Sequence, residues 1–264
     1  MCKFSIVTVS FNASQHIEET ILSVLNQDFK DYEYIIVDGG STDGTVDIIR
    51  KYSDKLTYWI SEKDHGIYDA MNKAIDLLKG NWVNFMNAGD IFYNDNVLSS
   101  IAKEIDFNYG VIFGDVIVNK FNITAREKSS HLYKKRSALS LGFNHQASFL
   151  RSDLAKKYKY NTNFKVAADF DLFLRVHKSG IEFKKVNTIV AIYDVNGFSV
   201  TNNKQHYLDR LYSAYGPCLR TKILYFKRCC MLFLRKKLRD YFPKISNRLE
   251  INHFLRNKSL INIK

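Results

Sequence analysis

The 264-residue chain has little of what marks several common classes of protein. It contains two prolines and four cysteines, none in a Cys-x-x-Cys pair, which disfavours a Pro-rich linker, a disulfide framework and a zinc site. No run of about 18 apolar residues occurs, so no spanning helix is predicted. The chain enters the apolar run at residues 4–9 without a basic leader, so no signal peptide is expected. These absences favour a protein that stays in the cytoplasm.

The composition is that of a soluble globular protein, with 46% hydrophobic and 25% charged residues, which argues against disorder and fibrous repeats. Its charge is uneven. The net charge is +12, yet residues 1–203 carry 24 basic and 24 acidic side chains, which leaves 15 basic and 3 acidic ones in residues 204–264. Such a basic tail is typical of contact with an anionic surface.

The basic tail favours a membrane over nucleic acid, because no helix-turn-helix, zinc-finger or ribonucleoprotein motif accompanies the charge. Apolar runs such as residues 229–234 alternate with basic clusters such as residues 235–237, which predicts a basic amphipathic helix in a membrane interface. Two alternatives stay open. The helix packs on the domain with its basic face in solvent, or it mediates dimerisation.

Strand-like and helix-like patterns alternate over the first 115 residues. Strands are predicted at residues 4–10, 34–37, 56–60 and 82–86, and helices at 17–25, 45–52, 67–78 and 94–105. This alternation predicts an α/β fold with a mostly parallel central sheet flanked by helices. Further along the chain, strands are predicted at 111–113, 147–150 and 188–193, and a helix at 170–178. We therefore expect a domain at 1–203, with halves 1–95 and 96–203, and a helical tail at 204–264.

Polar clusters follow the predicted strands, where ligands bind in parallel sheets. The first loop lacks Gly-x-Gly-x-x-Gly and the chain lacks Gly-x-x-x-x-Gly-Lys-Ser/Thr, which disfavours dinucleotide binding and the usual ATPase or kinase site. Asp38 and its Gly-rich turn instead suit hydrogen bonding to a base or ribose, although Asp-Gly pairs are also common turns.

Four runs in this order resemble bacterial family 2 glycosyltransferases of the GT-A type. They are TVSFN (8–12), VDGGSTDGT (37–45), SEKDHGIYDAMNKAI (61–75) and NFMNAGD (84–90). The resemblance covers about residues 3–200 and is most specific in the first 95. It implies an inverting hexosyltransferase that moves a sugar from a nucleotide sugar, most often a UDP-sugar, in the assembly of surface polysaccharides such as O-antigen. It also implies Mn²⁺ or Mg²⁺.

The resemblance also assigns a nucleotide site. It implies that Asp38 faces the uracil or ribose, that Asp64 contacts the base, and that Lys73 lies near the phosphates. The nucleotide-binding set it implies is Thr8, Ser10, Asn12, Asp38, Asp64 and Lys73.

The metal site departs from the family pattern. The family motif commonly reads Asp-x-Asp-Asp, whereas residues 87–90 are Asn-Ala-Gly-Asp and keep only the last carboxylate. Asp90 with the donor's diphosphate suffices for Mg²⁺ or Mn²⁺, and Asn87 can offer an amide oxygen. The alternative is that Asp90 caps the helix that follows.

The catalytic base is expected at the start of the helix near residue 170. The family's base usually follows a glutamate, and here Ala168 replaces that glutamate while Asp169 matches the base. Asp169 is the first candidate to deprotonate the acceptor hydroxyl and Asp171 the second. Either carboxylate could instead cap the helix.

Two further side chains are candidate donor or acceptor contacts. His145 follows a Lys- and Ser-rich segment, residues 129–143, that has the composition of a lid. Arg175 either steadies a phosphate or pairs with Asp171 on its own helix, and the ion pair is favoured.

Our main hypothesis is a transferase on the inner face of the cell membrane with a lipid-diphosphate-linked sugar as acceptor and no nucleic-acid partner. The basic tail favours that acceptor, because polyprenyl-linked intermediates sit at an anionic surface. Two alternatives stay open. One is a nucleotidyltransferase, which would need a Gly-rich loop with Arg and Lys after the first strand, and the other is a catalytically silent binding module for sugar nucleotides or a membrane surface. The degraded metal motif is the only support for the silent module.

Overall fold

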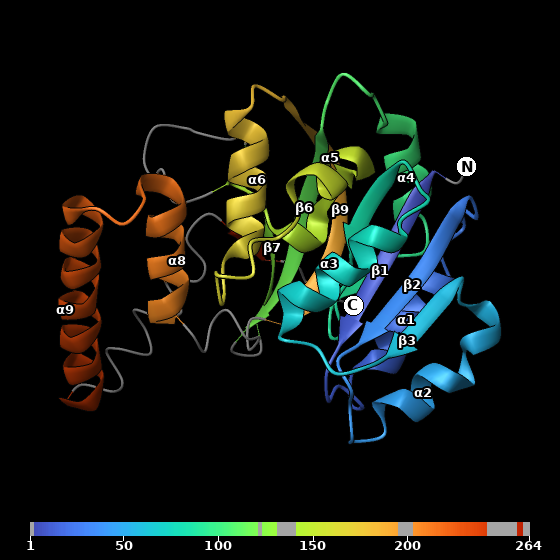
Figure 1. Ribbon diagram of the computed structural model, residues 1–264, viewed down its shortest axis with the longest axis horizontal. Coiled ribbons are helices and arrows are strands. Elements are labelled where there is room, and N and C mark those ends of the chain that lie inside the picture. The colour runs from blue at the N-terminus through green and yellow to red at the C-terminus, as the bar shows by residue number, and fades with distance from the viewer. Residues whose placement is uncertain (1–2, 121–122, 131–140, 195–202, 242–257, 261–264) are drawn as a thin grey trace.

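The computed structural model describes residues 3–120, 123–130, 141–194, 203–241 and 258–260. In this part of the chain, ten strands form one sheet with helices on both faces (Figure 1). Two further helices, α8 and α9, lie at one end of the molecule, and β3 and α2 lie at the other. The sheet therefore runs from an end beside α2 to an end that adjoins the C-terminal helices.

The first half is parallel, as the alternating pattern predicts. Strands β4, β1, β2 and β3 neighbour one another in that order and all run in the same direction. Every residue of β1 is buried, because helices cover both faces of the sheet. The elements are β1 (Phe4–Ser10), α1 (Ile17–Leu25), β2 (Tyr32–Asp38), α2 (Thr45–Lys51), a 3-10 turn η1 (Ser53–Lys55), β3 (Tyr58–Ser61), α3 (Ile67–Leu77) and β4 (Trp82–Phe85).

The second half is mostly antiparallel, so the prediction of a mostly parallel sheet is wrong beyond β4. Strand β8 lies between β4 and β6 and is antiparallel to both, while β6 pairs antiparallel with β7 and parallel with β9. The sheet is therefore mixed. The elements are β5 (Ile91–Phe92), α4 (Val97–Glu104), β6 (Val111–Lys120), β7 (Ile123–Glu127), η2 (His145–Ala147), β8 (Ser148–Arg151), α5 (Ser152–Tyr158), α6 (Ala168–Lys178), β9 (Phe183–Asp194) and β10 (Lys258–Leu260).

Side chains that alternate along the strands build a separate core on each face. Phe4 and Ile6 of β1 point to the core beneath α1, α2 and α4, whereas Val7 and Val9 point to the core beneath α3, α5 and α6. This period of two is what a strand covered on both sides requires. The two cores hold the carboxyl ends of β1, β2 and β4 in fixed positions relative to α6.

The described part of the tail is mostly helical, but it also contains a strand, so the prediction of a wholly helical tail is wrong at residues 258–260. Helix α8 (Asn203–Tyr215) packs on α6, and α9 (Leu219–Tyr241) packs on α8. Strand β10 follows and pairs antiparallel with β7 at the sheet edge. Among the described helices, none is both long and apolar enough to cross a bilayer.

Candidate active site

Asp38 ends β2 and lies at the centre of the first polar cluster. Its carboxylate accepts hydrogen bonds from the hydroxyls of Ser10 (2.8 Å), Ser41 (2.6 Å) and Ser61 (2.7 Å). The backbone N–H groups of Gly40 and Ser41 also donate to it, at 3.1 and 2.8 Å. The residue is completely buried. The carboxylate thus ties the ends of β1 and β3 to the turn that follows β2.

These contacts change the role of Asp38 and Ser10. Burial opposes ionisation, but the hydrogen bonds from Ser41, Ser61 and Ser10 outweigh it and lower the pKa of Asp38. Asp38 already accepts from five donors within the protein, and it would have to share its carboxylate with them to face a uracil or ribose as expected. It shapes the loops that would meet a nucleotide, and Ser10 is one of its supports.

Asn12 links the first loop to the second at the exposed rim of this cluster. Its backbone adopts a positive φ of 49°, which Asn tolerates better than most residues. Its N–H donates to Ser41 Oγ (2.8 Å), and its side-chain oxygen accepts from the Thr42 N–H (3.0 Å). Thr8, by contrast, is buried inside the core, where its hydroxyl donates to the Met86 carbonyl oxygen (2.7 Å). The Thr8 side chain therefore supports the sheet from within.

Asp64 and Lys73 lie near this cluster, and the side chain of each already has a partner within the protein. Asp64 packs so closely on Gly39 that a methyl group at residue 39 would lie 2.5 Å from Asp64 Oδ2. Its other oxygen accepts from the Gly66 N–H at 2.8 Å. Lys73 on α3 pairs with Glu62 at 2.6 Å, and this contact raises the pKa of Lys73. A phosphate would therefore have to compete with Glu62 for this ammonium.

The second polar cluster begins in the segment after β4. Asp90 is partly buried, and burial raises its pKa to about 6, although His145 and Gln146 act in the opposite direction. Gln146 Nε2 lies 3.5 Å from Asp90 Oδ1. Asn87 Nδ2 lies 3.3 Å from His145 Nε2, while Asn87 Oδ1 is buried and has no hydrogen-bond partner among the described residues. The segment thus presents two groups with few or no hydrogen bonds, the Asp90 carboxylate and the Asn87 side-chain oxygen.

These oxygens fit a hard divalent cation. No group of three or more His, Cys, Asp or Glu side chains in the described ranges could hold a metal ion. Mg²⁺ is nonetheless often bound by one or two carboxylates plus substrate phosphates. The Asp90 carboxylate and the orphaned Asn87 Oδ1 meet that requirement, and the Asp90 backbone is anchored because its carbonyl accepts from Thr20 Oγ1 at 2.9 Å.

His145 joins this segment to the start of α6. Its Nδ1 lies 3.4 Å from Asp169 Oδ2, and both side chains are about one-fifth exposed, at 23% and 22%. Burial disfavours the imidazolium, but the carboxylates of Asp169 and Asp90 outweigh burial and raise the pKa of His145. Three of the predicted site residues, Asn87, His145 and Asp169, therefore form one continuous polar chain beside Asp90.

Asp169, the first candidate base, lies in the first turn of α6. Burial alone would raise its pKa, but His145, helped by Arg210 and the Phe170 N–H, lowers the pKa to about 2. The carboxylate is therefore ionised at neutral pH. One oxygen, Oδ2, is engaged by His145, whereas Oδ1 is buried and finds no hydrogen-bond partner in the part of the chain that the structure describes. Oδ1 is therefore the oxygen of Asp169 that has room for a further hydrogen bond.

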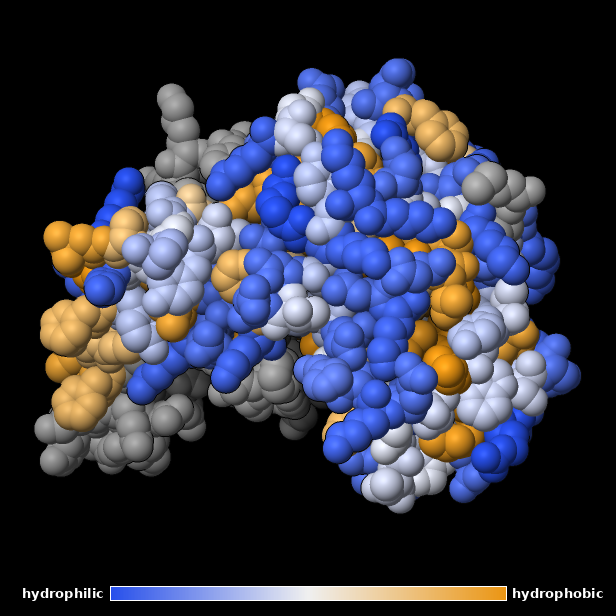
Figure 2. All heavy atoms as spheres, in the orientation of Figure 1, coloured by the Kyte–Doolittle hydropathy of each residue, from blue (hydrophilic) through white to orange (hydrophobic). Residues whose placement is uncertain are grey.

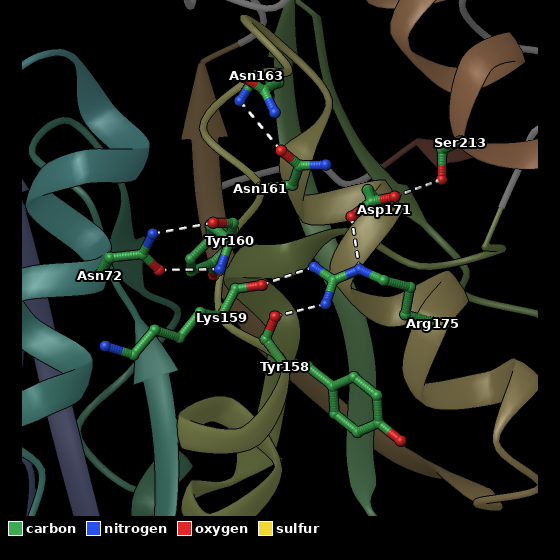
Figure 3. A network of polar contacts seen from close by, with 9 residues as sticks. All are labelled: Asn72, Tyr158, Lys159, Tyr160, Asn161, Asn163, Asp171, Arg175 and Ser213. Carbon is green, nitrogen blue, oxygen red and sulfur yellow. Dashed lines mark hydrogen bonds and ion pairs between the residues drawn. The ribbon is translucent and has the colours of Figure 1, made fainter. Parts of the chain in front are cut away.

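Asp171, the second candidate base, lies elsewhere. Figure 3 shows its carboxylate between Arg175 and Ser213, which donate to it at 2.7 and 2.9 Å. Arg175 in turn donates to the carbonyl oxygens of Tyr158 and Lys159, so it fastens α6 to the end of α5. Two residues along a helix turn a side chain by about 200°, so Asp169 and Asp171 point in different directions. Both oxygens of Asp171 are therefore already engaged within the protein, and Arg175 forms the ion pair that the sequence favours.

The predicted lid lies mostly outside the described residues, which omit 131–140. At its described ends, the Ser130 N–H donates to the Gly142 carbonyl at 2.7 Å. This bond brings the two ends of the segment together just before His145.

Comparison with known proteins shows the family and the fold of this chain. A model of the family described as glycosyl transferase family 2 matches residues 5–177, well over half of the chain. The chain belongs to glycosyltransferase family 2. This family 2 transferase is 31% identical over 219 residues to a PGL/p-HBAD biosynthesis glycosyltransferase of Mycobacterium bovis, covering 79% of this chain and 83% of the relative.

A second relative of this family 2 transferase comes from Campylobacter jejuni. It is a GalNAc(5)-diNAcBac-PP-undecaprenol beta-1,3-glucosyltransferase, 25% identical over 227 residues, with 81% of this chain and 72% of the relative covered. Two solved structures share the fold. TarS 1–349 of S. aureus with UDP-GlcNAc has a TM-score of 0.63 at 21% identity and covers 81% of this chain and 67% of its own. A mannosyltransferase of Pyrobaculum calidifontis with GDP-Man and Mn²⁺ has a TM-score of 0.63 at 17% identity, covering 85% and 70%. The expected GT-A fold is confirmed.

The family 2 site also contains residues that the sequence did not single out. The Asp209 carboxylate, from α8, accepts from the N–H groups of Val166 (2.8 Å) and Ala167 (3.3 Å), directly before Asp169. Tyr68 on α3 donates to the Val166 carbonyl at 2.6 Å. These two residues fix the segment that leads into α6. Only Tyr68, inside the 61–75 run, carried a signal in the sequence, whereas Asp209 stood in the presumed tail.

Proposed function

We propose that this family 2 glycosyltransferase moves a hexosyl group, with inversion, from a UDP-sugar to a lipid-diphosphate-linked sugar acceptor. The observation that carries the proposal is the Asp169 carboxylate, ionised through His145, whose Oδ1 is buried and has no partner among the described residues. Complexes of TarS with UDP and UDP-GlcNAc support the donor class. The undecaprenol-linked substrate named for the Campylobacter jejuni relative supports the acceptor class.

Asp169 acts as the general base in this proposal. The acceptor hydroxyl donates its proton to Asp169 Oδ1 while its oxygen attacks the anomeric carbon from the face opposite the diphosphate. The bond from that carbon to the diphosphate oxygen breaks, and its electron pair leaves with UDP. One displacement therefore inverts the anomeric centre. His145 keeps the base ionised and holds Oδ2, which leaves Oδ1 for the hydroxyl.

The donor lies at the other end of the polar chain in this proposal. Asn12, Asp64 and Lys73 surround the exposed rim of the Asp38 cluster, where a nucleoside would dock. Asp90 and Asn87 would hold Mn²⁺ or Mg²⁺ against the diphosphate. The bound ion would neutralise charge that develops on the leaving group. His145, between Asn87 and Asp169, then lies where the transferred sugar passes.

An acceptor of this kind would place the enzyme at the inner face of a bacterial cell membrane, in surface polysaccharide assembly. The excess of 15 basic over 3 acidic residues in 204–264 supports that location. Neither a nucleotidyltransferase nor a silent binding module is favoured by any contact in the site.

The proposal is tested by incubating the purified protein with UDP-, GDP- and dTDP-sugars, with Mn²⁺ or with EDTA, and a synthetic lipid-diphosphate sugar. We expect metal-dependent transfer from one donor and, by NMR, a product whose anomeric configuration is opposite to that of the donor. A product with retained configuration would exclude the single displacement at Asp169. Failure of every donor to bind, with metal present, would overturn the nucleotide site.

A further inference from the structure

Helix α9 carries large apolar side chains that are largely exposed to solvent. Leu219, Phe226 and Leu234 are 73%, 69% and 59% exposed, whereas Thr221 is completely buried. At about 100° per residue, five of the exposed apolar residues fall within an arc of about 100°, and Thr221 lies on the opposite side of the helix. Met231, which is 41% exposed, lies about 60° beyond that arc. Figure 2 shows apolar surface gathered over α9 at the edge of the molecule. The outer stripe consists of Leu219, Ile223, Phe226, Phe233 and Leu234.

Basic side chains border the outer stripe on both sides. Lys222 lies at one edge and Lys227 at the other, and both are exposed. By sequence, α9 contains eight basic residues and one acidic residue. An apolar stripe flanked by lysines is the pattern of a helix that lies in the plane of a membrane interface and attracts anionic lipids.

Charge also decides between a membrane and a second copy of the chain. In a symmetric dimer the same surface meets itself, so two strongly basic α9 helices would face each other. Like charges placed opposite one another across an interface are unfavourable, whereas an anionic lipid surface is complementary to this helix. We propose that the outer stripe of α9 inserts into an anionic membrane interface and docks the transferase there.

This docking would orient the catalytic half toward the lipid. Helix α8 lies between α9 and α6, and its Asp209 holds the segment before Asp169. Figure 1 places α2 and β3 at the far end of the molecule from α9. A membrane-borne acceptor would thus approach from the side of α8 and α6. Only this orientation toward a lipid-linked acceptor rests on the proposed function, because membrane binding itself is measurable without sugar transfer.

The first test is sedimentation of the full chain with vesicles of phosphatidylcholine alone or of phosphatidylcholine with phosphatidylglycerol. We expect binding to the anionic vesicles, released by salt, and a loss of about tenfold or more in the double variant Phe226→Glu with Leu234→Glu. The matched control is Phe107→Glu, since Phe107 is 56% exposed on a loop outside the tail and should bind vesicles as the unmodified protein does.

A second variant covers the case in which the double variant fails to fold. Phe226→Trp keeps the stripe apolar, and its fluorescence should shift to the blue and be quenched by brominated anionic lipids, whereas Phe107→Trp should show neither change. Unaltered vesicle binding by a folded double variant, or an unquenched Trp at 226, would overturn the proposal. So would a lipid-free dimer that Phe226→Glu dissociates, because the stripe would then be an interface between two copies. Vesicle binding without any sugar transfer would leave the docking face intact and count against the proposed function only.

Discussion

Two polar clusters lie at the same edge of the sheet and differ in how completely their hydrogen bonds are satisfied. Around Asp38, three serine hydroxyls and two backbone N–H groups converge on one buried carboxylate. Around Asp169, one imidazole engages one oxygen, and the described residues leave the other oxygen of Asp169 and Oδ1 of Asn87 without partners. Buried polar atoms are usually paired, so unmet ones mark places where a ligand completes the bonding.

The contrast distinguishes Asp38, which organises loops, from Asp169, the candidate base, although both aspartates have lowered pKa values. Neutral donors stabilise the charge of Asp38, and none of them titrates near neutral pH. The charge of Asp169 depends on His145, which itself titrates and also faces Asp90. A carboxylate held by fixed donors organises a loop, whereas one coupled to a histidine can exchange a proton during a reaction.

The largest expected effect comes from removing the charge of Asp169, in the cluster whose hydrogen bonds are incomplete. We expect Asp169→Asn to lower kcat about 10³-fold, since an amide cannot take the acceptor proton and a positioned base contributes about 10² to 10⁴. Donor affinity should stay within about twofold, because the nucleotide loops belong to the Asp38 cluster. Steady-state kinetics and calorimetric titration with the donor measure the two quantities.

Asp171→Asn is the matched control, two residues along the same helix. It removes a charge that pairs with Arg175, so it should lower thermal stability while kcat stays near that of the unmodified protein. A loss of kcat in Asp171→Asn as large as that in Asp169→Asn would reverse our assignment of the base.

The next largest effect is on the free energy of unfolding, when Asp38 loses its charge. Asp38→Asn replaces an acceptor by an NH₂ group that faces existing donors, and we expect unfolding free energy at pH 7 to fall by about 3 kcal/mol. Because the folded-state pKa of Asp38 is lowered, its contribution is present above the ordinary carboxyl pKa and is lost as pH falls through the folded value. The difference between the two proteins should therefore shrink below about pH 4. Urea unfolding at pH 7 and pH 3 measures it, and a difference that does not change with pH would mean that charge is unimportant there.

The sequence predicted the scaffold better than the orientation of its side chains. The strand at 4–10 and the helix at 17–25 match the structure because period-two and helical spacings are local properties of the chain. The antiparallel half was missed because short strands such as β5 and β7 depend on pairing with distant partners rather than on their own pattern. Helix α5 likewise shows little periodicity of its own.

The same limit explains the mixed outcome at the site. Asp38 and Asp171 are satisfied by residues from other elements, such as Ser61 and Ser213, and no local spacing reports those contacts. The ion pair from Asp171 to Arg175 was foreseeable because residues four apart share a helix face. The contact of Asp209 with residues 166 and 167 depends on α8 packing against α6, which the charge pattern of the tail concealed.

A smaller effect should follow when the segment before Asp169 loses its contact with the Asp209 carboxylate. We expect Asp209→Ala to lower kcat about tenfold without changing donor affinity, because two N–H groups before Asp169 lose their acceptor and the base shifts. Asp209→Asn keeps an oxygen acceptor and should restore most of the rate. Measured kcat and KM values decide the matter, and a lowered melting temperature with unchanged kcat would show that Asp209 only stabilises the fold.

The smallest effect is expected at Asn12, which lies at the exposed rim of the Asp38 cluster. Asn12→Gly preserves the positive φ but removes the oxygen that accepts from Thr42, whereas Asn12→Ala also imposes backbone strain of about 1 kcal/mol. We therefore expect the Kd for UDP to rise slightly in the Gly variant and severalfold in the Ala variant, by calorimetric titration with Mn²⁺ present. Equal losses in both variants would assign the effect to the side chain alone. If the larger loss follows the backbone, the role of the Asp38 cluster is to hold a loop shape that the nucleotide recognises, while the bonds that change during the reaction belong to the cluster of Asp169.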